Sequence, residues 1–317
     1  MKFFRKLIFF LCCAVSASNH FVSADQNAAY KEIARPRLVK IQSALELVPA
    51  EYQKDVLSAF KKSGRNGWEL IKAIQNVSPQ QREGMAFLIA NMPGRDLVAL
   101  NGDFLIENVR LAYQAMGDIP WGKDIPREIF LNNVLPYAIV NERRDNWRKD
   151  FYEKFIKAAQ ESKTIDQAVA KLNTYVFDTL HVSYDAVKRP KPDQSPYESI
   201  QTRYASCTGL AILLADALRS VGIPARLAGV AMWADQSGNH TWVEIWDGQW
   251  RHIGAGEPTE LDQAWFSGKA SQTDAKHPVC ATSFKKTGLS FPMRWAPSLK
   301  FVPAVDVTED YTQLRIR

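Results

Sequence analysis

The sequence predicts an α+β fold in which a helical N-terminal region precedes a core of helix packed on antiparallel sheet. Three observations predict it. Apolar residues recur at helical spacing from about residue 28 to residue 163. Residues 207–221 repeat this pattern, and Gly222 and Pro224 then stop the helix. β-Branched and aromatic residues alternate in 240–246, and the Asp247-Gly248 pair predicts a two-residue hairpin turn into 249–253.

The first 24 residues have the pattern of a secretory signal peptide. Lys2, Arg5 and Lys6 precede an apolar stretch at 7–15, and small residues end the segment at Ala24. A membrane anchor is the alternative, but this stretch is shorter than the ~20 residues that a spanning helix needs. We therefore expect cleavage near Ala24, a mature chain without a membrane span, and a secreted or periplasmic protein.

Composition places the mature chain among ordinary globular proteins. The 317 residues are 46% hydrophobic and 23% charged. The formal charge of +6 includes the three basic residues of the leader, so the mature chain carries only about +3. The basic cluster at 188–191 is typical of a solvated loop, and we expect no nucleic-acid partner.

The chain divides by pattern into a signal peptide (1–24), a helical N-terminal domain (25–163), a catalytic core (164–280) and a C-terminal β-rich extension (281–317). A capping box at Thr164 opens the core with a helix that runs to Leu180. In the extension, alternation predicts strands and a final edge strand at 311–317. Whether these strands join the core sheet or form a separate module stays open.

Cys207 and His240 are the candidate reactive pair. Cys207 lies in the first turn of its helix, where free N–H groups and the helix dipole favour a thiolate. His240 follows 33 residues later at the start of a strand that can lie beside that helix end. The two therefore predict a thiolate–imidazolium pair, which a cysteine nucleophile needs near neutral pH.

Only Cys207 and Cys280 remain after the leader, which holds Cys12 and Cys13, is removed. A disulfide between the two is the alternative to a free Cys207 in an oxidising compartment. The helix-start position of Cys207 favours the free thiol, and Cys280 is then expected to be a small buried residue.

These segments resemble the transglutaminase-like superfamily of cysteine enzymes over roughly residues 165–258. The matching features are a cysteine at a helix start, a helix exit, a histidine strand, a tight turn and a tryptophan: Cys207, Gly222-Ile223-Pro224-Ala225-Arg226, His240-Thr241-Trp242-Val243-Glu244, Asp247-Gly248 and Trp250. The resemblance implies a papain-like core, in which the nucleophile's helix packs on an antiparallel sheet, and a Cys-His-Asp catalytic triad.

The third member of the triad departs from the family pattern. The family usually has an aspartate four residues after the tryptophan that matches Trp250, and this position is Gly254 here. Glu257, followed by Pro-Thr, is similar to the same element displaced by three residues. A glutamate can also orient the imidazole, so we expect Glu257 to complete the triad. If it cannot reach His240, the site is a dyad or is inactive.

Other site residues are predicted from position. The backbone N–H groups of Tyr204 and Ser206, beside Cys207, are candidates for an oxyanion hole. Trp242 shares a strand face with His240, so it either lines the substrate cleft or belongs to the core. Arg226 is expected to pair with an acid. Since no histidine pair has metal-ligand spacing, we expect neither a metal nor another cofactor.

The resemblance implies a cysteine hydrolase or acyltransferase that attacks an amide or peptide bond and forms a thioester. Water as the acceptor gives a peptidase or amidase, an amine gives acyl transfer, and the substrate is a peptide, protein or glycopeptide. Two alternatives remain. One is a catalytically inactive transglutaminase-like module that binds peptide or glycan, and the other is an interaction protein whose helical N-terminal half is the working part.

Overall fold

The computed structural model describes residues 39–257 and 260–312. The chain separates into two compact units, residues 1–43 and 44–317, and every element below belongs to the second. The expected signal peptide lies outside the described residues, and the domain boundaries drawn from the sequence stay predictions. In the part of the chain that is described, no helix combines the length and apolar character required to cross a bilayer.

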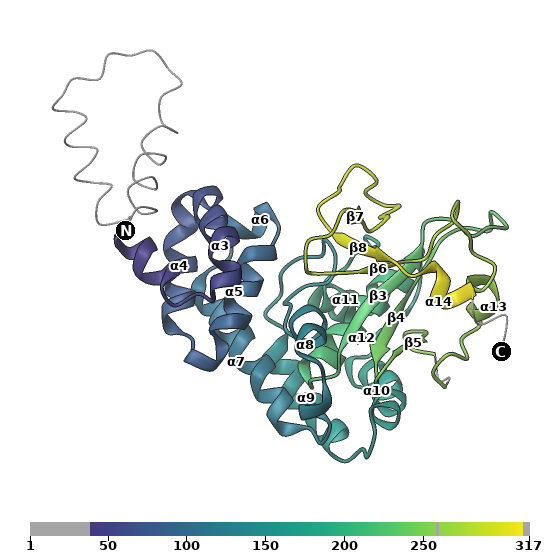
Figure 1. The fold of residues 1–317 in the computed structure, drawn as a ribbon. Coiled ribbons are helices and arrows are strands. Elements are labelled where there is room, and N and C mark those ends of the chain that lie inside the picture. Colours follow the sequence, from purple (N-terminus) through teal and green to yellow (C-terminus); the bar gives the residue numbers. More distant parts are fainter. Residues whose placement is uncertain (1–38, 258–259, 313–317) are drawn as a thin grey trace, which may run out of the picture. The chain divides into compact units, whose positions relative to one another are not determined.

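Between residues 50 and 160, all regular elements of the described chain are helices (Figure 1). The α-helices are α3 (Ala50–Lys62), α4 (Gly67–Asn76), α5 (Arg82–Asn91), α6 (Gly94–Leu97), α7 (Gly102–Asp118), α8 (Arg127–Asn133) and α9 (Arg148–Gln160), with short 3-10 turns at Gly64–Asn66, Pro79–Gln81 and Gly122–Asp124. Local sequence accounts for several starts: Pro49 precedes α3, and the side chain of Asn101 accepts the N–H of Phe104 to cap α7.

Three helices lead into the core. α10 (Ile165–Leu180) is capped by Thr164, whose hydroxyl accepts from Gln167 N, and this confirms the predicted start. α11 (Pro196–Thr202) begins with a complete capping box between Ser195 and Glu198. α12 (Cys207–Ser220) is buried along nearly its whole length and ends before Gly222, which has a φ of +79°.

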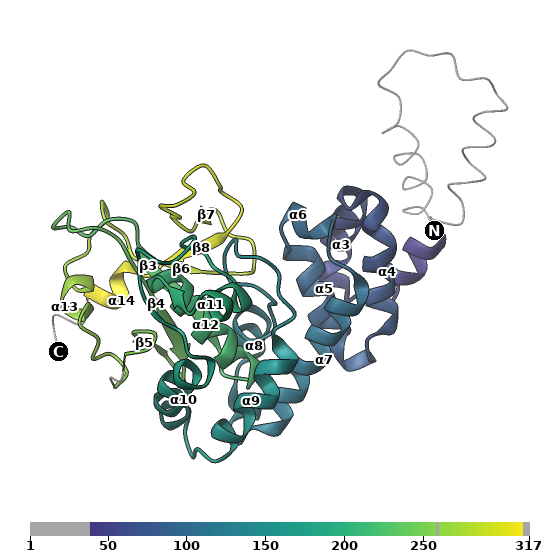
Figure 2. The same cartoon turned by 180° about the vertical axis from the view of Figure 1, so that it is seen from behind.

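The core sheet has six antiparallel strands in the order β5-β4-β3-β6-β8-β7. They are β3 (Ala225–Val230), β4 (His240–Trp246), β5 (Trp250–Ile253), β6 (Cys280–Thr282), β7 (Leu289–Ser290) and β8 (Pro303–Asp306), and a separate parallel pair joins β1 (Ser183–Tyr184) to β2 (Tyr204–Ala205). α12 packs on one face of β3 and β4, which the reverse view shows in front of the strands (Figure 2). The fold class is therefore α+β, as predicted.

The alternation of β4 divides the core into two layers. Val243 and Ile245 join the apolar cluster around α12. Trp242 belongs to a second cluster on the opposite face, beside α13 (Ser267–Ala270) and α14 (Thr308–Thr312). Successive residues of β4 thus serve different sides of the sheet.

The C-terminal extension joins the core sheet, because β6 pairs with β3 and β8 pairs with β6. The final strand expected at 311–317 is wrong at its start, since Tyr311 lies in α14; residues 313–317 are outside the described part. The carboxylate of Asp306 accepts hydrogen bonds from the N–H and hydroxyl of Thr308, and acidic residues follow in the first turn. These features favour a helix start over a strand.

The β4–β5 hairpin is confirmed, but its turn is one residue longer than predicted. Trp246 pairs with Trp250, which leaves Asp247, Gly248 and Gln249 in the turn. Gly248 has a φ of +109°, a conformation that glycine adopts readily.

Candidate active site

Cys207 occupies the open N-terminus of α12. Its side chain is half-buried, and its thiol is free. The hydroxyl of Ser206, the residue that would normally cap the helix, instead donates to the carbonyl oxygen of Pro192 at 3.1 Å. The first backbone bond of the helix runs from Leu210 N to Ser206 O. Within the described chain, the N–H groups of the first turn therefore remain open to a ligand.

A hydrogen bond holds the start of α12 against the start of β4. Thr208 Oγ1 donates to Thr241 Oγ1 at 3.2 Å, and both side chains are buried. The two bonded threonines directly follow Cys207 and His240 in the chain. The structure thus brings the two predicted reactive residues to neighbouring positions on packed elements.

The His240 imidazole lies among aromatic rings. The ring centroids of Trp265 and Phe266 lie at 4.8 and 4.9 Å, and those of Trp242 and Trp233 at 5.9 and 6.3 Å. Burial lowers the pKa of His240 to about 4. The imidazole is therefore neutral at physiological pH.

No hydrogen bond joins His240 to Cys207 or Glu257 among the described residues, and Nε2 of the ring is buried without a partner. Burial thus favours a neutral imidazole, whereas the sequence predicted an imidazolium paired with a thiolate. A neutral imidazole can still accept the thiol proton when the nucleophile attacks.

Glu257 occupies the place that a side chain at position 254 would take. An ideal Cβ built on Gly254 would lie 2.2 Å from Oε2 of Glu257 and 2.7 Å from Oε1. Gly254 directly follows β5, two residues after His252, which pairs with Glu244 of the His240 strand. The Glu257 carboxylate therefore occupies the space of a side chain at position 254, and its part in a catalytic triad stays a prediction.

Trp265 connects this carboxylate to the histidine. Its indole Nε1 donates to Oε1 of Glu257 at 2.9 Å, while its ring packs on His240. Burial raises the pKa of Glu257, and the bond from Trp265 opposes that shift. Trp265 is 60% exposed, although it is a large apolar side chain.

Asn173 of α10 fixes the loop that carries Glu257. Its Nδ2 donates to the carbonyl oxygens of Gly254 at 3.0 Å and Glu257 at 2.6 Å, and its Oδ1 accepts from Gly256 N at 2.9 Å. Asn173 is buried, and these bonds use both ends of its amide.

Trp242 supports the histidine from inside the protein. It is fully buried, so it does not face a substrate, and its Nε1 donates to Tyr311 Oη at 2.7 Å. Tyr311 Oη in turn donates to Glu244 Oε1 at 2.6 Å, and Arg226 pairs with Glu244 Oε2 at 2.6 Å. The expected acid partner of Arg226 is confirmed.

Tyr204 in β2 and Ser206 at the N-cap position of α12 directly precede Cys207 in the chain. The Tyr204 carbonyl accepts from Gln194 and Thr202, and the Lys188 ammonium lies 4.6 Å from the centre of its ring. Ser206 is buried. Their part in an oxyanion hole stays a prediction.

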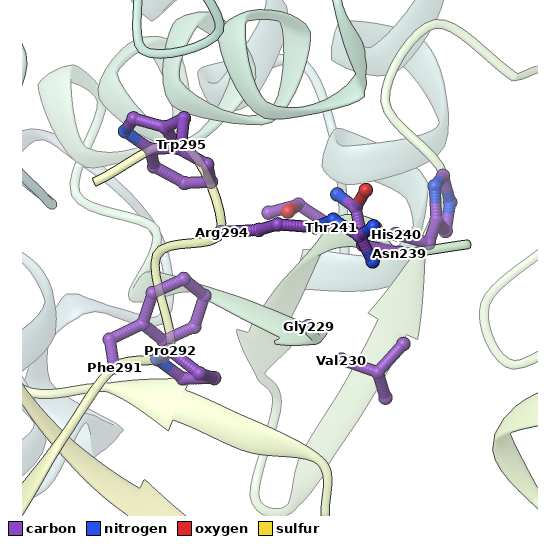
Figure 3. A pocket seen from close by; sticks show the side chains of 9 residues that line it. All are labelled: Gly229, Val230, Asn239, His240, Thr241, Phe291, Pro292, Arg294 and Trp295. Atoms are coloured by element: carbon purple, nitrogen blue, oxygen red, sulfur yellow. The ribbon is translucent and has the colours of Figure 1, made fainter. Parts of the chain in front are cut away.

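A shallow pocket opens beside the start of β4. It is lined by residues of β3, of the β4 start and of the segment 291–295: Gly229, Val230, Asn239, His240, Thr241, Phe291, Pro292, Arg294 and Trp295 (Figure 3). Sequence reasoning missed the residues that reach the site from beyond the core motifs, namely Trp265, Phe266, Arg294 and Trp295. Their local sequence carries no signal, because only the tertiary fold brings them to His240.

Cys280 is not bonded to Cys207, so the disulfide alternative is excluded. Burial, with a smaller contribution from Asp306, raises the pKa of the Cys280 thiol to about 11. In the described part of the chain, no three or more His, Cys, Asp or Glu side chains are grouped to hold a metal ion.

Comparison with known proteins identifies the core. Residues 150–255 match the profile of the transglutaminase-like superfamily. Among solved structures, a protein from Cytophaga hutchinsonii described as a candidate cysteine protease matches with 18% sequence identity and a TM-score of 0.33. That match covers 47% of this chain and only 50% of the other. No curated protein is a significant match. Residues 150–255 of this chain are thus similar to the core of the transglutaminase-like superfamily.

Proposed function

We propose that this protein is a cysteine enzyme that attacks an amide or peptide bond through Cys207 and forms a thioester. One observation carries the proposal: Cys207 lies at an open helix N-terminus that a buried threonine pair holds beside the strand of His240. A thiol there has both a stabilising dipole and a nearby base.

The proposed reaction begins with the neutral His240. The imidazole accepts the Sγ–H proton while Sγ bonds to the carbonyl carbon, and the N–H groups of the first turn of α12 bind the oxyanion. The tetrahedral intermediate then expels the amine, which takes the proton from the imidazolium. Water hydrolyses the thioester in a peptidase or amidase, whereas a primary amine captures it in acyl transfer.

Glu257 is the proposed third member of the triad. Its carboxylate fills the space of a side chain at position 254 and contacts Trp265, which packs on His240. A carboxylate close to the ring stabilises the imidazolium that forms during attack and fixes the tautomer of the base. Support for this role is positional, since the Glu257 carboxylate accepts its hydrogen bond from Trp265 Nε1 and not from His240.

The proposed setting is outside the cytoplasm. The leader at residues 1–24 directs the chain to secretion or to the periplasm, where its substrate would be a peptide, protein or glycopeptide.

Two parallel assays test the proposal on the mature protein. Release of acid-soluble peptides from casein measures hydrolysis, and incorporation of a fluorescent primary amine into casein measures acyl transfer. Either activity should disappear in Cys207→Ala and fall at least about 100-fold in His240→Gln, because the base is lost. Cys280→Ala, which removes the other free thiol, is the matched control and should retain activity.

The proposal fails if wild type shows neither activity and Cys207 reacts with iodoacetamide with the pH dependence of an ordinary thiol. The alternative of an inactive peptide- or glycan-binding module would then replace it.

A further inference from the structure

The pocket beside the start of β4 has one charged side chain. Arg294 is exposed, and its Nη1 donates to the carbonyl oxygen of Ala231 at 3.3 Å and contacts Met232 Sδ at 3.8 Å. Other arginines of the core, such as Arg226 and Arg251, form ion pairs with acids. Across the described residues, no carboxylate lies within ion-pair distance of Arg294. Most of its five N–H donors are therefore free to bind a ligand.

Two neutral polar groups share this pocket with Arg294. Asn239 is exposed and can donate two N–H bonds from its amide. Thr241 Oγ1 accepts from Thr208, so its own hydroxyl hydrogen is free to donate. Figure 3 shows the Arg294 side chain extending across the start of β4 toward Asn239 and Thr241, with the His240 ring to one side. Three kinds of donor thus line one small space.

The remaining lining of the pocket is apolar. Phe291, Pro292 and Trp295 come from the segment that precedes β8, and Trp295 is held by a bond from its Nε1 to Asn141 Oδ1 at 3.2 Å. The space between these residues is a shallow hollow in the surface that is open to solvent. The hollow therefore offers an apolar surface beside the exposed donors of Arg294 and Asn239, where an acceptor group of a bound ligand can lie.

We propose that this pocket is a subsite for a carboxylate on the substrate, bound by Arg294 with Asn239 and Thr241. The planar guanidinium matches a carboxylate with two parallel bonds, which a lysine cannot reproduce. Because His240 also lines the pocket, the carboxylate belongs to the residue next to the amide under attack. The inference rests on the proposed function and narrows its substrate class to peptides with an acidic side chain or a free C-terminal carboxylate at this place.

If Arg294 had only a structural role, its substitution would have a different effect on ligand binding. Its bond to Ala231 joins the segment 291–295 to the loop that follows β3. If this were its whole role, substitution would weaken neutral and acidic ligands alike. The effect of ligand charge therefore separates the two roles.

The experiment uses the full mature chain with Cys207→Ala, so that binding is measured without chemistry. Three glutamine peptides serve as probes: N-acetyl-glutamine with a free C-terminal carboxylate, N-acetyl-aspartyl-glutamine amide with an acidic side chain, and N-acetyl-asparaginyl-glutamine amide, which is neutral. The indole ¹⁵N–¹H NMR signal of Trp295 reports occupancy of the pocket.

We expect at least one acidic probe to bind about fivefold or more tightly than the neutral probe, which is the scale of one exposed charge pair. Arg294→Gln should abolish that preference and leave the affinity for the neutral probe unchanged. Arg294→Lys should keep only part of it. Lys300→Gln, which removes an exposed charge between the segment 291–295 and β8 and outside the pocket lining, is the matched control and should bind as the parent does.

The better acidic probe identifies the source of the carboxylate. Equal affinity for all three probes would overturn the subsite, and so would an acidic preference that survives in Arg294→Gln. Neither result depends on a reactive Cys207, so failure of the subsite and failure of the proposed enzyme activity are separate outcomes.

Discussion

Returning the carboxylate from position 257 to position 254 is the most direct test of the displaced triad. In Gly254→Asp alone, the new Cβ would fall 2.2 Å from Glu257 Oε2 and would add a second negative charge. In the double variant Gly254→Asp with Glu257→Ala, that space is empty and an aspartate fills it. Cys207 should therefore be acylated faster in the double variant than in Gly254→Asp alone.

The size of the effect follows from one hydrogen bond to a charged group. Such a bond contributes about 1.5–3 kcal/mol, so Glu257→Ala should slow acylation of Cys207 about 10- to 150-fold. In Gly254→Asp the acylation rate should fall by at least as much, because the new side chain displaces the Glu257 carboxylate and has no room of its own. The double variant should recover to within about tenfold of wild type, since it restores a carboxylate in the same space.

Intact-mass measurement of Cys207 alkylation by iodoacetamide provides an assay that needs no known substrate. Rates are taken from about pH 5 to pH 9, across the range where imidazole and thiol titrate, and turnover of casein is measured beside them. Cys280 is buried, so alkylation there reports unfolding of the variant.

Trp265→Phe is the matched control, because it keeps a ring against His240 and removes only the Nε1 donor to Glu257. If Glu257 acts on the imidazole, this variant retains most of the wild-type rate. If Glu257 acts only by holding Trp265, Trp265→Phe and Glu257→Ala lose the same amount. Wild-type rates in Glu257→Ala at every pH would refute the third triad member altogether.

Three stability measurements test the surroundings of the site. Arg148 is fully buried and donates hydrogen bonds to Asn108 and four backbone carbonyls. In urea unfolding, Arg148→Met should lower the free energy of unfolding by about 3–5 kcal/mol, whereas the same change at the exposed Lys149 should lower it by less than about 0.5 kcal/mol. Equal losses in the two variants would contradict this prediction. Burial holds the pKa of His240 at about 4, below its ordinary value, so its contribution to stability is complete above about pH 6.5 and is lost as pH falls toward 4. When the pH falls from 7 to 4.5, the free energy of unfolding of His240→Phe should therefore rise by about 2–3 kcal/mol relative to that of wild type. A difference that does not depend on pH would show that the imidazole is not desolvated. Tyr311→Phe removes the hydroxyl between Trp242 and Glu244 and should cost about 1–3 kcal/mol; an unchanged unfolding midpoint would contradict its place in that network.

The positions of the candidate residues Cys207 and His240 in the fold could be predicted, because local patterns determine the helix start and the strand start where they lie. Cys207 precedes an apolar helix that Gly222 ends, and His240 opens an alternating strand that returns through a glycine turn. Each feature depends on residues within one element. Packing of that helix on that strand then follows from the apolar faces that both must bury.

The protonation state of the pair could not be predicted in the same way. The sequence places a base near a thiol, but the lowered pKa of His240 comes from burial among rings that the tertiary fold assembles. Trp265 and Arg294 reach the site from segments without a motif. Tyr311 was expected in a strand because its segment alternates, and the acceptor at Asp306 instead starts a helix there.

The missing aspartate shows why spacing along the chain is a weaker guide than position in space. Gly254 has no side chain, and Gly256 adopts a φ of +76°, so the chain can turn back over position 254. Asn173 then bonds to both sides of this turn and sets where Glu257 begins. A longer side chain, starting three residues later, therefore brings its carboxylate to the position of the shorter one. The two glycines and the glutamate together place a carboxylate beside position 254. A search for an aspartate at a fixed interval after Trp250 would report that no carboxylate is present.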